Sequence, residues 1–483
     1  MNCKKKSFYL PLAIALVFMS CTSTPTTTTE DVVEEPKIEK VEKKEEKKKE
    51  EPADIRFVKA LQELLEKNDY KGAIKLFEKL PEELKNDVDL RYLQASILYS
   101  DSQYDNAISV CNYILTIDPV HKDTIELLSR IYKANGDKSA ASKLNDKILE
   151  QDPYNPSVNI QKAEEQVLRK KWKLARTYYG RALQGDPDNL DAMYGYAKMT
   201  YYLNDLDKAE EILFKILDKD PDNVSALAYI GTIEFDRENY YQACNFVEVA
   251  LSLDPNNYNN LVDYGTYLRY LGRYDEAIAT WNKAISINPD NFLPYIYVAS
   301  IYDQEKNDYK TALDYYYTAV QKNPKYPYAY ESIAVLEYHL GNFDQAAKAF
   351  QGAYSFRNSF DYAIMIAACY MQSGKDAEAK KVLEQQMKLL PDHNSTEYAL
   401  VRFFHDTYNT NAYNSLTRKV NAVENSNVRG KYTFYLGLYN ELNGSDKVAE
   451  EYYAQVASLQ APMFFEYRLA EWGLQKWAKH STF

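Results

Sequence analysis

The chain has 483 residues, of which 46% are hydrophobic and 14% aromatic, including 45 tyrosines, so it has ample apolar surface for a buried core. Its formal net charge is −12. A chain this acidic is poorly suited to bind nucleic acid or anionic polysaccharide through its overall field, and we expect no nucleic-acid partner.

Residues 1–20 have the layout of a secretion signal, with three lysines before a nearly apolar run that ends at Met19. The run is too short for an ordinary membrane span. Ser20 and Cys21 follow, and this ending resembles a bacterial lipobox, which implies that Cys21 is diacylated and becomes the mature N-terminus. We expect an exported chain, lipid-anchored to the cell envelope at the periplasmic face or the cell surface. An ordinary cleaved signal and an uncleaved anchor are the alternatives.

Residues 21–53 form a Thr-rich piece followed by EEPKIEKVEKKEEKKKEEPAD. The segment has few apolar side chains to bury, so we expect a disordered tether that lifts the folded part away from the membrane.

From residue 54 to residue 393 one phrase returns with a spacing of 33 to 35 residues. Its most regular mark is an alanine, found at Ala73, Ala107, Ala141, Ala175, Ala209, Ala243, Ala277, Ala312, Ala346 and Ala379. A fixed period of this length is typical of a solenoid, in which each unit buries its apolar face only against its neighbours.

The unit 258–291 shows how one repeat is built. Two apolar stripes with helical spacing predict two helices: Leu261, Tyr264, Gly265 and Leu268, then Ala277, Trp281 and Ala284. Gly272 separates the two helices, and Pro289 ends the second because proline cannot continue a helix. The Asp and Asn residues after that proline can cap the next helix.

This pattern resembles the tetratricopeptide repeat family over roughly residues 54–461. The family's Gly, Tyr, Ala, aromatic, Ala and Pro positions are occupied by Gly265, Tyr274, Ala277, Trp281, Ala284 and Pro289. The resemblance implies an all-α fold, a right-handed superhelical solenoid of about 11–12 helical hairpins. Residues 394–461 read as degenerate hairpins, and 462–483 as a capping helix and tail. We expect Trp472 and Trp477 to cover the last apolar face; an exposed docking patch is the alternative.

In this family the first helix of each hairpin lines the concave face, where peptides or partner proteins bind. The corresponding positions give the candidate binding residues Tyr92, Tyr99, Arg130, Lys133, Tyr194, Lys198, Tyr201, Tyr202, Phe235, Arg269, Tyr270, Tyr328 and Tyr338. Tyrosine suits a recognition surface because it combines a broad apolar face with a polar tip and few rotors. The alternative is that these tyrosines only pack neighbouring repeats together.

We find no candidate for catalysis, for a cofactor or for a metal. The five histidines lack ligand spacing, and no Gly-rich phosphate loop occurs. Cys111, Cys244 and Cys369 fall in separate hairpins, too far apart to be paired, and we expect packed thiols.

We therefore expect a membrane-tethered scaffold that binds a peptide or an envelope protein along its concave surface, in envelope assembly or transport. The first alternative is a surface adhesin for a host or matrix molecule, including a glycan recognised by the lysines of the groove. The second is an enzyme with a site in residues 394–429, where VRFFHDTY is the only cue.

Overall fold

A computed structural model describes residues 52–406, 410–459 and 464–480. The expected signal peptide, Cys21 and nearly all of the expected tether lie outside the described residues, as does the side chain of Trp477.

The described chain is all-helical and contains 25 α-helices and one short 3-10 helix, Glu82–Leu84. The odd-numbered helices up to α23 are the first helices of hairpins: α1 (Ala53–Glu66), α3 (Val88–Ser100), α5 (Lys122–Ala134), α7 (Pro156–Leu168), α9 (Leu190–Tyr202), α11 (Val224–Asp236), α13 (Tyr258–Tyr270), α15 (Leu293–Gln304), α17 (Pro327–His339), α19 (Phe360–Gln372), α21 (Thr396–His405) and α23 (Ser426–Leu442). The even-numbered helices are their partners: α2 (Tyr70–Phe77), α4 (Tyr104–Ile117), α6 (Lys138–Gln151), α8 (Trp172–Gly185), α10 (Leu206–Lys219), α12 (Tyr240–Leu253), α14 (Tyr274–Ile287), α16 (Tyr309–Lys322), α18 (Phe343–Phe356), α20 (Asp376–Leu389), α22 (Thr410–Asn421) and α24 (Asp446–Ser458). The last helix, α25 (Phe465–His480), stands alone.

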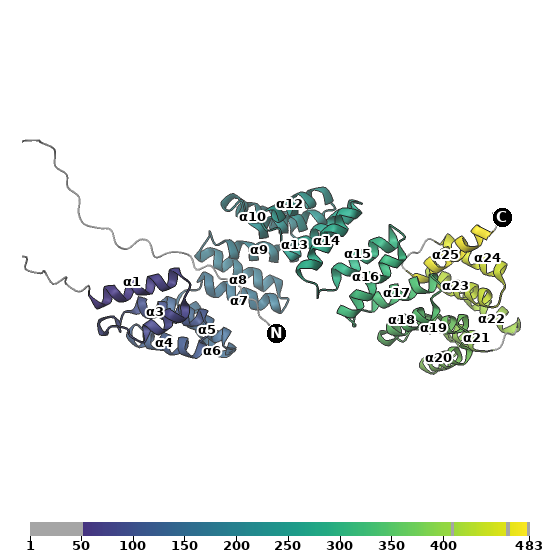
Figure 1. The fold of residues 1–483 in the computed structure, drawn as a ribbon, viewed down its shortest axis with the longest axis horizontal. Helices are drawn as coiled ribbons and strands as arrows, with labels where there is room; N and C mark the ends of the chain where they lie inside the picture. The colour runs from purple at the N-terminus through teal and green to yellow at the C-terminus, as the bar shows by residue number, and fades with distance from the viewer. Residues whose placement is uncertain (1–51, 407–409, 460–463, 481–483) are drawn as a thin grey trace, which may run out of the picture.

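Each odd helix packs on the even helix that follows it, so α1 to α24 form twelve hairpins that wind into an elongated superhelix (Figure 1). The expected all-α repeat solenoid is confirmed. In most hairpins the turn reverses through one residue in the left-handed region. This residue is a glycine at Gly272, as the sequence predicts, but it is Asn204 or Glu238 in other hairpins. The main-chain geometry of the turn therefore recurs even where the glycine signal is missing.

The repeated alanines lie where the helices cross. All ten are buried, and nine of them have no exposed surface, because the paired helices approach too closely for a larger side chain. The Asn residue just before each of α7, α9, α11 and α13 accepts a hydrogen bond from the backbone N–H three residues later, as Asn223 does from Ala226 at 3.0 Å. The expected capping after the prolines is thus present.

Packing differs between the two ends of the array. From Phe57 to Ile301 the buried apolar residues divide into five separate clusters, as expected for stacked hairpins. From Ala299 to Trp472 they form a single cluster. Helices α19 and α23 are buried on all sides over long stretches, 361–369 and 432–439. Helices buried on all sides belong to a closed core, so the C-terminal hairpins surround their own first helices.

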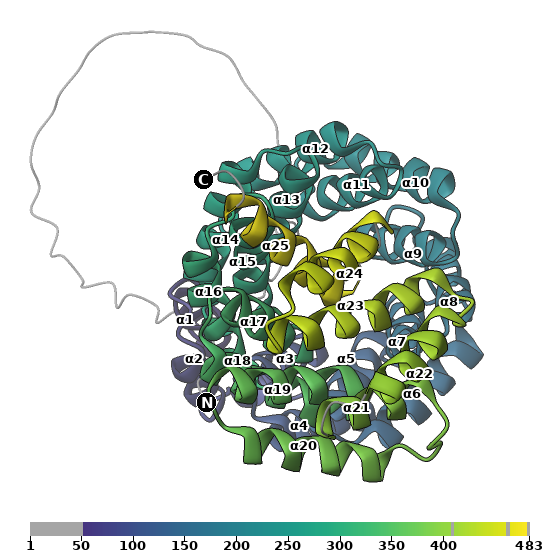
Figure 2. The ribbon, with the colours of Figure 1, turned by 90° about the vertical axis from the view of Figure 1, so that its right-hand side faces the viewer.

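Helix α25 completes this closed part. It packs on α24 and α23 and also reaches back across the superhelix to α17, so that it lies inside the ring of helices when the molecule is viewed end-on (Figure 2). The return contact spans more than a hundred residues, and the repeat pattern did not predict it.

Candidate functional site

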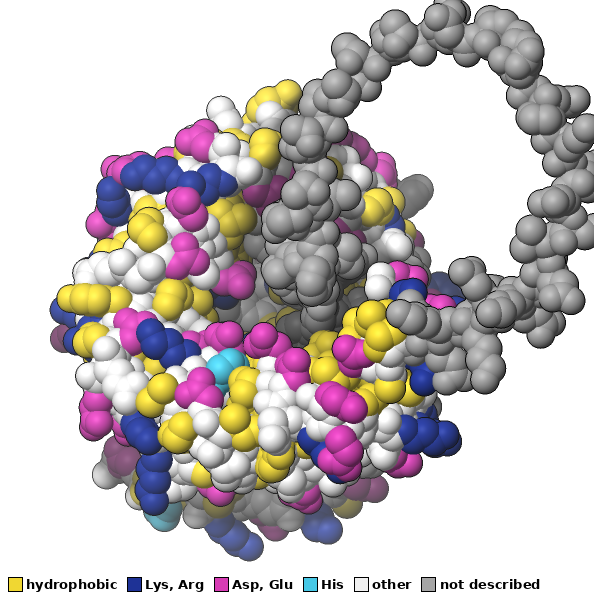
Figure 3. All heavy atoms as spheres, turned by 90° about the vertical axis from the view of Figure 1, so that its left-hand side faces the viewer, with side chains coloured by type: hydrophobic (Ala, Val, Ile, Leu, Met, Phe, Trp, Pro, Cys, Tyr) yellow, Lys and Arg dark blue, Asp and Glu magenta, His cyan; other side chains and the backbone are white. Residues whose placement is uncertain are grey.

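The first helices line the inner face of the solenoid. Neighbouring first helices come close to one another, α3 to α5, α7 to α9, α9 to α11 and α11 to α13. Elements that approach most closely lie on the inside of a curve, so the odd-numbered helices are concave-facing. Seen from the end that the first hairpins form, the described side chains are arranged as a ring (Figure 3). In this view Lys and Arg gather mainly at the outer edge of the ring, and acidic side chains lie along its inner edge.

The middle of the inner face carries two connected groups of aromatic rings. In the first, Tyr201 lies edge-on to Tyr202 and Tyr229, with ring centroids 5.5 and 5.3 Å apart, and Tyr202 stacks on Trp172 at 4.7 Å. Tyr194 joins the group through Tyr229 at 5.8 Å.

The second group begins one hairpin later. Phe235 stacks on Tyr267 at 4.7 Å and lies edge-on to Tyr270 at 4.9 Å. Tyr202 and Tyr270 remain 45% and 57% exposed although each touches another ring. The structure thus brings together five of the predicted residues, and two of them keep large faces open for a partner.

Acidic side chains lie among these rings. Tyr201 donates a hydrogen bond to the carboxylate of Asp236, and burial together with this bond raises the pKa of the tyrosine hydroxyl. The side chain of Asp263 is exposed, but it lies on the inner face, where the surrounding helices exclude part of its water. This partial desolvation raises the pKa of its carboxyl to about 6.

The predicted basic residues do not form a continuous track. Lys198 lies over the ring of Tyr229 at 5.9 Å, Arg269 donates to Gln304 at 3.2 Å, and Lys133 pairs with Glu164 at 3.4 Å. Helix α11, between the helices of Lys198 and Arg269, contains no Lys or Arg. A sulfated or otherwise anionic chain would therefore meet an interruption at the centre of the inner face.

The predicted residues nearer the N-terminus lie apart from the central rings. Tyr92 is half-buried 6.1 Å from the ring of His121, and burial raises the pKa of its hydroxyl. Tyr99 contacts Tyr104 at 6.1 Å within its own hairpin. Arg130 is exposed on α5 at the edge of a pocket.

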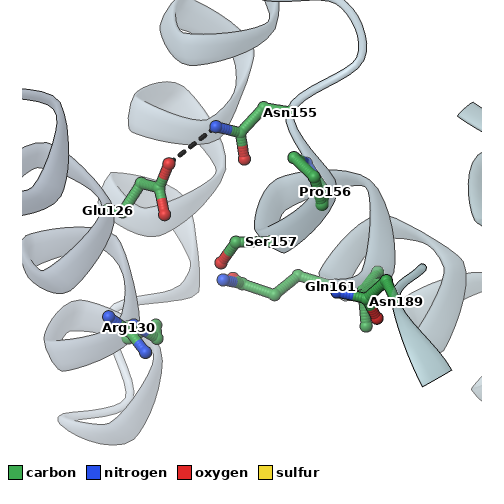
Figure 4. A pocket seen from close by; sticks show the side chains of 8 residues that line it. Glu126, Arg130, Asn155, Pro156, Ser157, Gln161 and Asn189 are labelled. Carbon is green, nitrogen blue, oxygen red and sulfur yellow. Dashed lines mark hydrogen bonds between the residues drawn. The ribbon is translucent and has the colours of Figure 1, made fainter. Parts of the chain in front are cut away.

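This pocket of about 450 Å³ opens between α5, α7 and α9 (Figure 4). Asn155 donates to Glu126 at 2.6 Å and also caps α7, so its amide is already used by the fold. Gln161 accepts from the buried Asn145 at 3.4 Å, and Asn189 caps α9. Most polar groups around the pocket hold the junction of hairpins 3 and 4 together.

The C-terminal candidates fall in the closed part of the array. Tyr328 is 68% exposed at the start of α17. Tyr338 is half-buried against Phe343, and desolvation raises the pKa of its hydroxyl well above the ordinary value. The inner face is therefore still open at the start of α17 and closes farther along that helix, where α25 packs against it.

Sequence reasoning missed Tyr229, Asp263 and Tyr267. Tyr229 and Asp263 are each the sixth residue of a first helix, a position that the family pattern did not select. In a helix the sixth position lies beside the fifth and ninth positions, which the family pattern did select. A search that included the positions next to the selected ones would therefore have found Tyr229 and Asp263. Missed as well were Arg468 and Trp472 as inner-face residues, because only the path of α25 brings them there.

Within the described ranges no group of three or more His, Cys, Asp or Glu side chains is arranged to hold a metal ion. None of the helices described combines the length and apolar character that crossing a bilayer requires. Cys111, Cys244 and Cys369 are free and buried, and burial raises the pKa of Cys111 to about 12. In VRFFHDTY, Phe403 and Phe404 belong to the core.

Family models described as "Tetratricopeptide repeat" match residues 58–121, 167–230 and 297–362, and a model described as "TPR repeat" matches residues 265–304. The matches lie on hairpins that the structure shows, in register with the buried alanines. The chain belongs to the tetratricopeptide repeat family. Repeats of this family are protein-interaction modules, so the inner face of this tetratricopeptide repeat protein is its candidate interaction surface.

Several solved structures are similar to parts of the array. A crystal structure of MamA is 22% identical and covers 34% of this chain and 95% of that chain, with a TM-score of 0.31. PilF of Pseudomonas aeruginosa is 18% identical over 42% of this chain and 92% of that chain, with a TM-score of 0.39. YrrB, described as a TPR protein with an unusual peptide-binding site, is 20% identical over 39% of this chain and 96% of that chain, with a TM-score of 0.32. These likenesses are too low to carry a functional conclusion. No curated protein matches the sequence.

Proposed function

We propose that this tetratricopeptide repeat protein is a membrane-tethered scaffold that binds an extended segment of a partner protein along the inner face of its first eight hairpins. The observation that carries the proposal is the contrast between the two ends of the inner face. Between α9 and α15 aromatic rings stand open to solvent, whereas beyond the start of α17 the same face is filled by α19, α23 and α25.

The open rings suit a protein segment better than an anionic glycan. Aromatic faces bury apolar side chains at a low cost in rotamer entropy, and the tyrosine hydroxyls can bond to a peptide backbone. The interrupted basic residues and the acids at Asp236 and Asp263 disfavour a sulfated glycan. Within the adhesin alternative, a glycan ligand would then have to be an uncharged one.

A photo-crosslinking amino acid tests the surface. Placed at Tyr202 on the inner face, it should capture a partner in cells, whereas at Tyr241, which is 65% exposed on the second helix α12, it should capture far less of it. The partner should then bind the purified protein, and Tyr202→Ala combined with Tyr270→Ala should weaken that binding at least about tenfold. Equal capture from both positions would contradict an inner-face site.

We also propose that the protein is exported and held to the cell envelope through a lipid on Cys21, as the first 21 residues suggest. Lipid-anchored attachment of such a scaffold would suit a role in envelope assembly or transport. Cys21→Ala should release the protein from membranes in cell fractionation, and mass spectrometry of the parent should find acyl chains on that cysteine. A Cys21→Ala protein that stays in the membrane fraction with its signal removed would defeat the anchor.

A further inference from the structure

Two carboxylates on the inner face have no cationic partner in the described part of the chain. Elsewhere the array pairs acids across hairpins, as in Lys219–Asp188 at 2.7 Å and Lys306–Asp275 at 2.6 Å. Asp236 accepts a hydrogen bond from the hydroxyl of Tyr201 and forms no ion pair. Asp263 forms none either, and partial desolvation of this solvent-exposed carboxyl is the only cause of its raised pKa.

Both carboxylates act on the same aromatic surface. Burial is the main cause of the raised pKa of the hydroxyl of Tyr267, and the charges of Asp263 and Asp236 add to it; burial likewise raises the pKa of Tyr297 on α15, with a further contribution from Asp263. The basic side chain nearest to this surface on α13 is Arg269, which donates to Gln304 instead. The region around Tyr267 thus holds two carboxylates that form no ion pair in the described chain, although Arg269 also acts on this surface and its charge partly offsets the rise in the pKa of Tyr297.

The neighbouring rings add a second attraction for cations. The faces of aromatic rings carry negative potential, and a Lys or Arg above such a face is stabilised by it. The chain uses this contact itself, since Lys198 lies over Tyr229. Tyr201, Tyr229 and Phe235 lie within one hairpin of the two free carboxylates.

We propose that the segment bound between α9 and α15 is an extended, basic one, with Lys or Arg side chains beside Asp236 and Asp263 and their aliphatic stems against Tyr201 and Tyr270. This inference rests on the proposed function and names the chemistry of the partner. The charge is complementary, and a bound cation would offset the cost of keeping the partly desolvated carboxylate of Asp263 ionised at neutral pH.

Three fluorescent 12-residue peptides test the proposal. They share one sequence except at four positions, which carry Lys, Gln or Glu. The Lys peptide should bind the purified protein, and the Glu peptide should not. Asp236→Asn with Asp263→Asn should weaken the Lys peptide at least about tenfold. The control pair, Asp218→Asn with Asp314→Asn, makes the same change of net charge on second helices and should have less than about a twofold effect. Far-UV circular dichroism checks that both pairs fold.

A pH titration gives an independent readout. Asp263 gives up its proton near pH 6 in the free protein, and a bound cation lowers that pKa, so binding of the Lys peptide should weaken as the pH falls from about 7 to about 5. Tyr297 and Arg269 face the same surface, and Tyr267 is buried beside it; the raised pKa of each tyrosine hydroxyl keeps both tyrosines neutral over this range. Asp263→Asn should flatten the profile.

The outcomes separate this inference from the proposed function. The proposal of a basic segment would be overturned if the two pairs of Asn substitutions weakened binding of the Lys peptide equally. It would also be overturned if the Gln and Lys peptides bound equally well. If a photo-crosslinker at Tyr202 captured only the Gln or Glu peptide, the chemistry proposed here would be wrong and the peptide-binding function would stand. If it captured no peptide of any charge, both would fail. Capture of residues 21–51 of the same chain would overturn the assignment to a partner.

Discussion

Arg468, on the last helix, reaches across the superhelix and donates hydrogen bonds to both carboxylate oxygens of Asp303, 165 residues earlier in the chain. Asp303 is only 2% exposed. Beside this pair, Trp472 stacks on His339 at 3.9 Å and receives the guanidinium of Arg468 over its ring at 4.2 Å. These contacts attach α25 to the inner face of hairpins 8 and 9 and close that end of the groove.

Replacing Arg468 by Ala should destabilise the protein, because Asp303 would keep a buried charge with no cationic partner, and only the hydroxyl of Tyr316, at 3.5 Å, would still donate to it. We expect a loss on the order of 3 kcal/mol in the free energy of unfolding, measured with urea. Lys476→Ala is the control, since Lys476 is 61% exposed and pairs with Glu441 at 3.2 Å, and we expect it to cost less than about 1 kcal/mol. Losses of similar size in both variants would show that the Asp303 pair does not hold α25.

Glu466→Gln should change how stability depends on pH. Glu466 is fully buried, accepts from Tyr435 at 2.8 Å, and has its pKa raised from 4.5 to about 7, mainly by desolvation. The folded protein therefore holds a proton that the unfolded chain releases, and Glu466 contributes less stability as the pH rises from about 4.5 to about 7. In the Gln variant the free energy of unfolding should not show this decrease between about pH 4.5 and pH 7. Urea unfolding at several pH values checks this, and parallel curves for the two proteins would contradict it.

Gly265→Ala should destabilise the fold although it improves helix propensity. A Cβ at Gly265 would lie 2.4 Å from the indole nitrogen of Trp281, which is buried and donates to the carbonyl of Val262 at 3.0 Å. We expect a loss of about 1–3 kcal/mol from overpacking. Gly180→Ala is the matched change, because its Cβ would meet only the half-buried ring of Tyr196, at 3.2 Å, and it should gain up to about 1 kcal/mol. Thermal melts that rank the two variants the other way would refute the packing argument.

Helix α6 should open more readily than the helices around it. It buries only Ala141 and Asn145, whereas α10 buries four apolar side chains, and the junction beside α6 is held by the polar contacts of Asn145 with Ser129 at 2.5 Å and with Gln161 at 3.4 Å. Native-state hydrogen exchange should find the amides of α6 at least about tenfold less protected than those of α10. Equal protection would mean that the polar junction is as stable as the apolar ones.

The sequence alone determined the repeat, and with it the hairpins, because their cause is local. The alanines from Ala73 to Ala379 recur where helices must approach closely, and a change at any one of them would be felt within its own hairpin. The same periodicity placed Tyr201, Tyr202, Phe235 and Tyr270 on one face of their helices, and the structure gathers them on the inner side of the solenoid.

Only the tertiary structure decided where the inner face is open. Tyr270 is exposed, whereas Tyr338 packs against Phe343. This difference depends on the curvature of the twelve hairpins and on the return of α25 to Asp303, and a single repeat shows neither the curvature nor the return. The sequence shows that residues 236 and 263 are aspartates. It does not show that, within the described chain, no Lys or Arg side chain forms an ion pair with them. A residue's own type sets its charge, whereas its partners are set by segments distant in sequence.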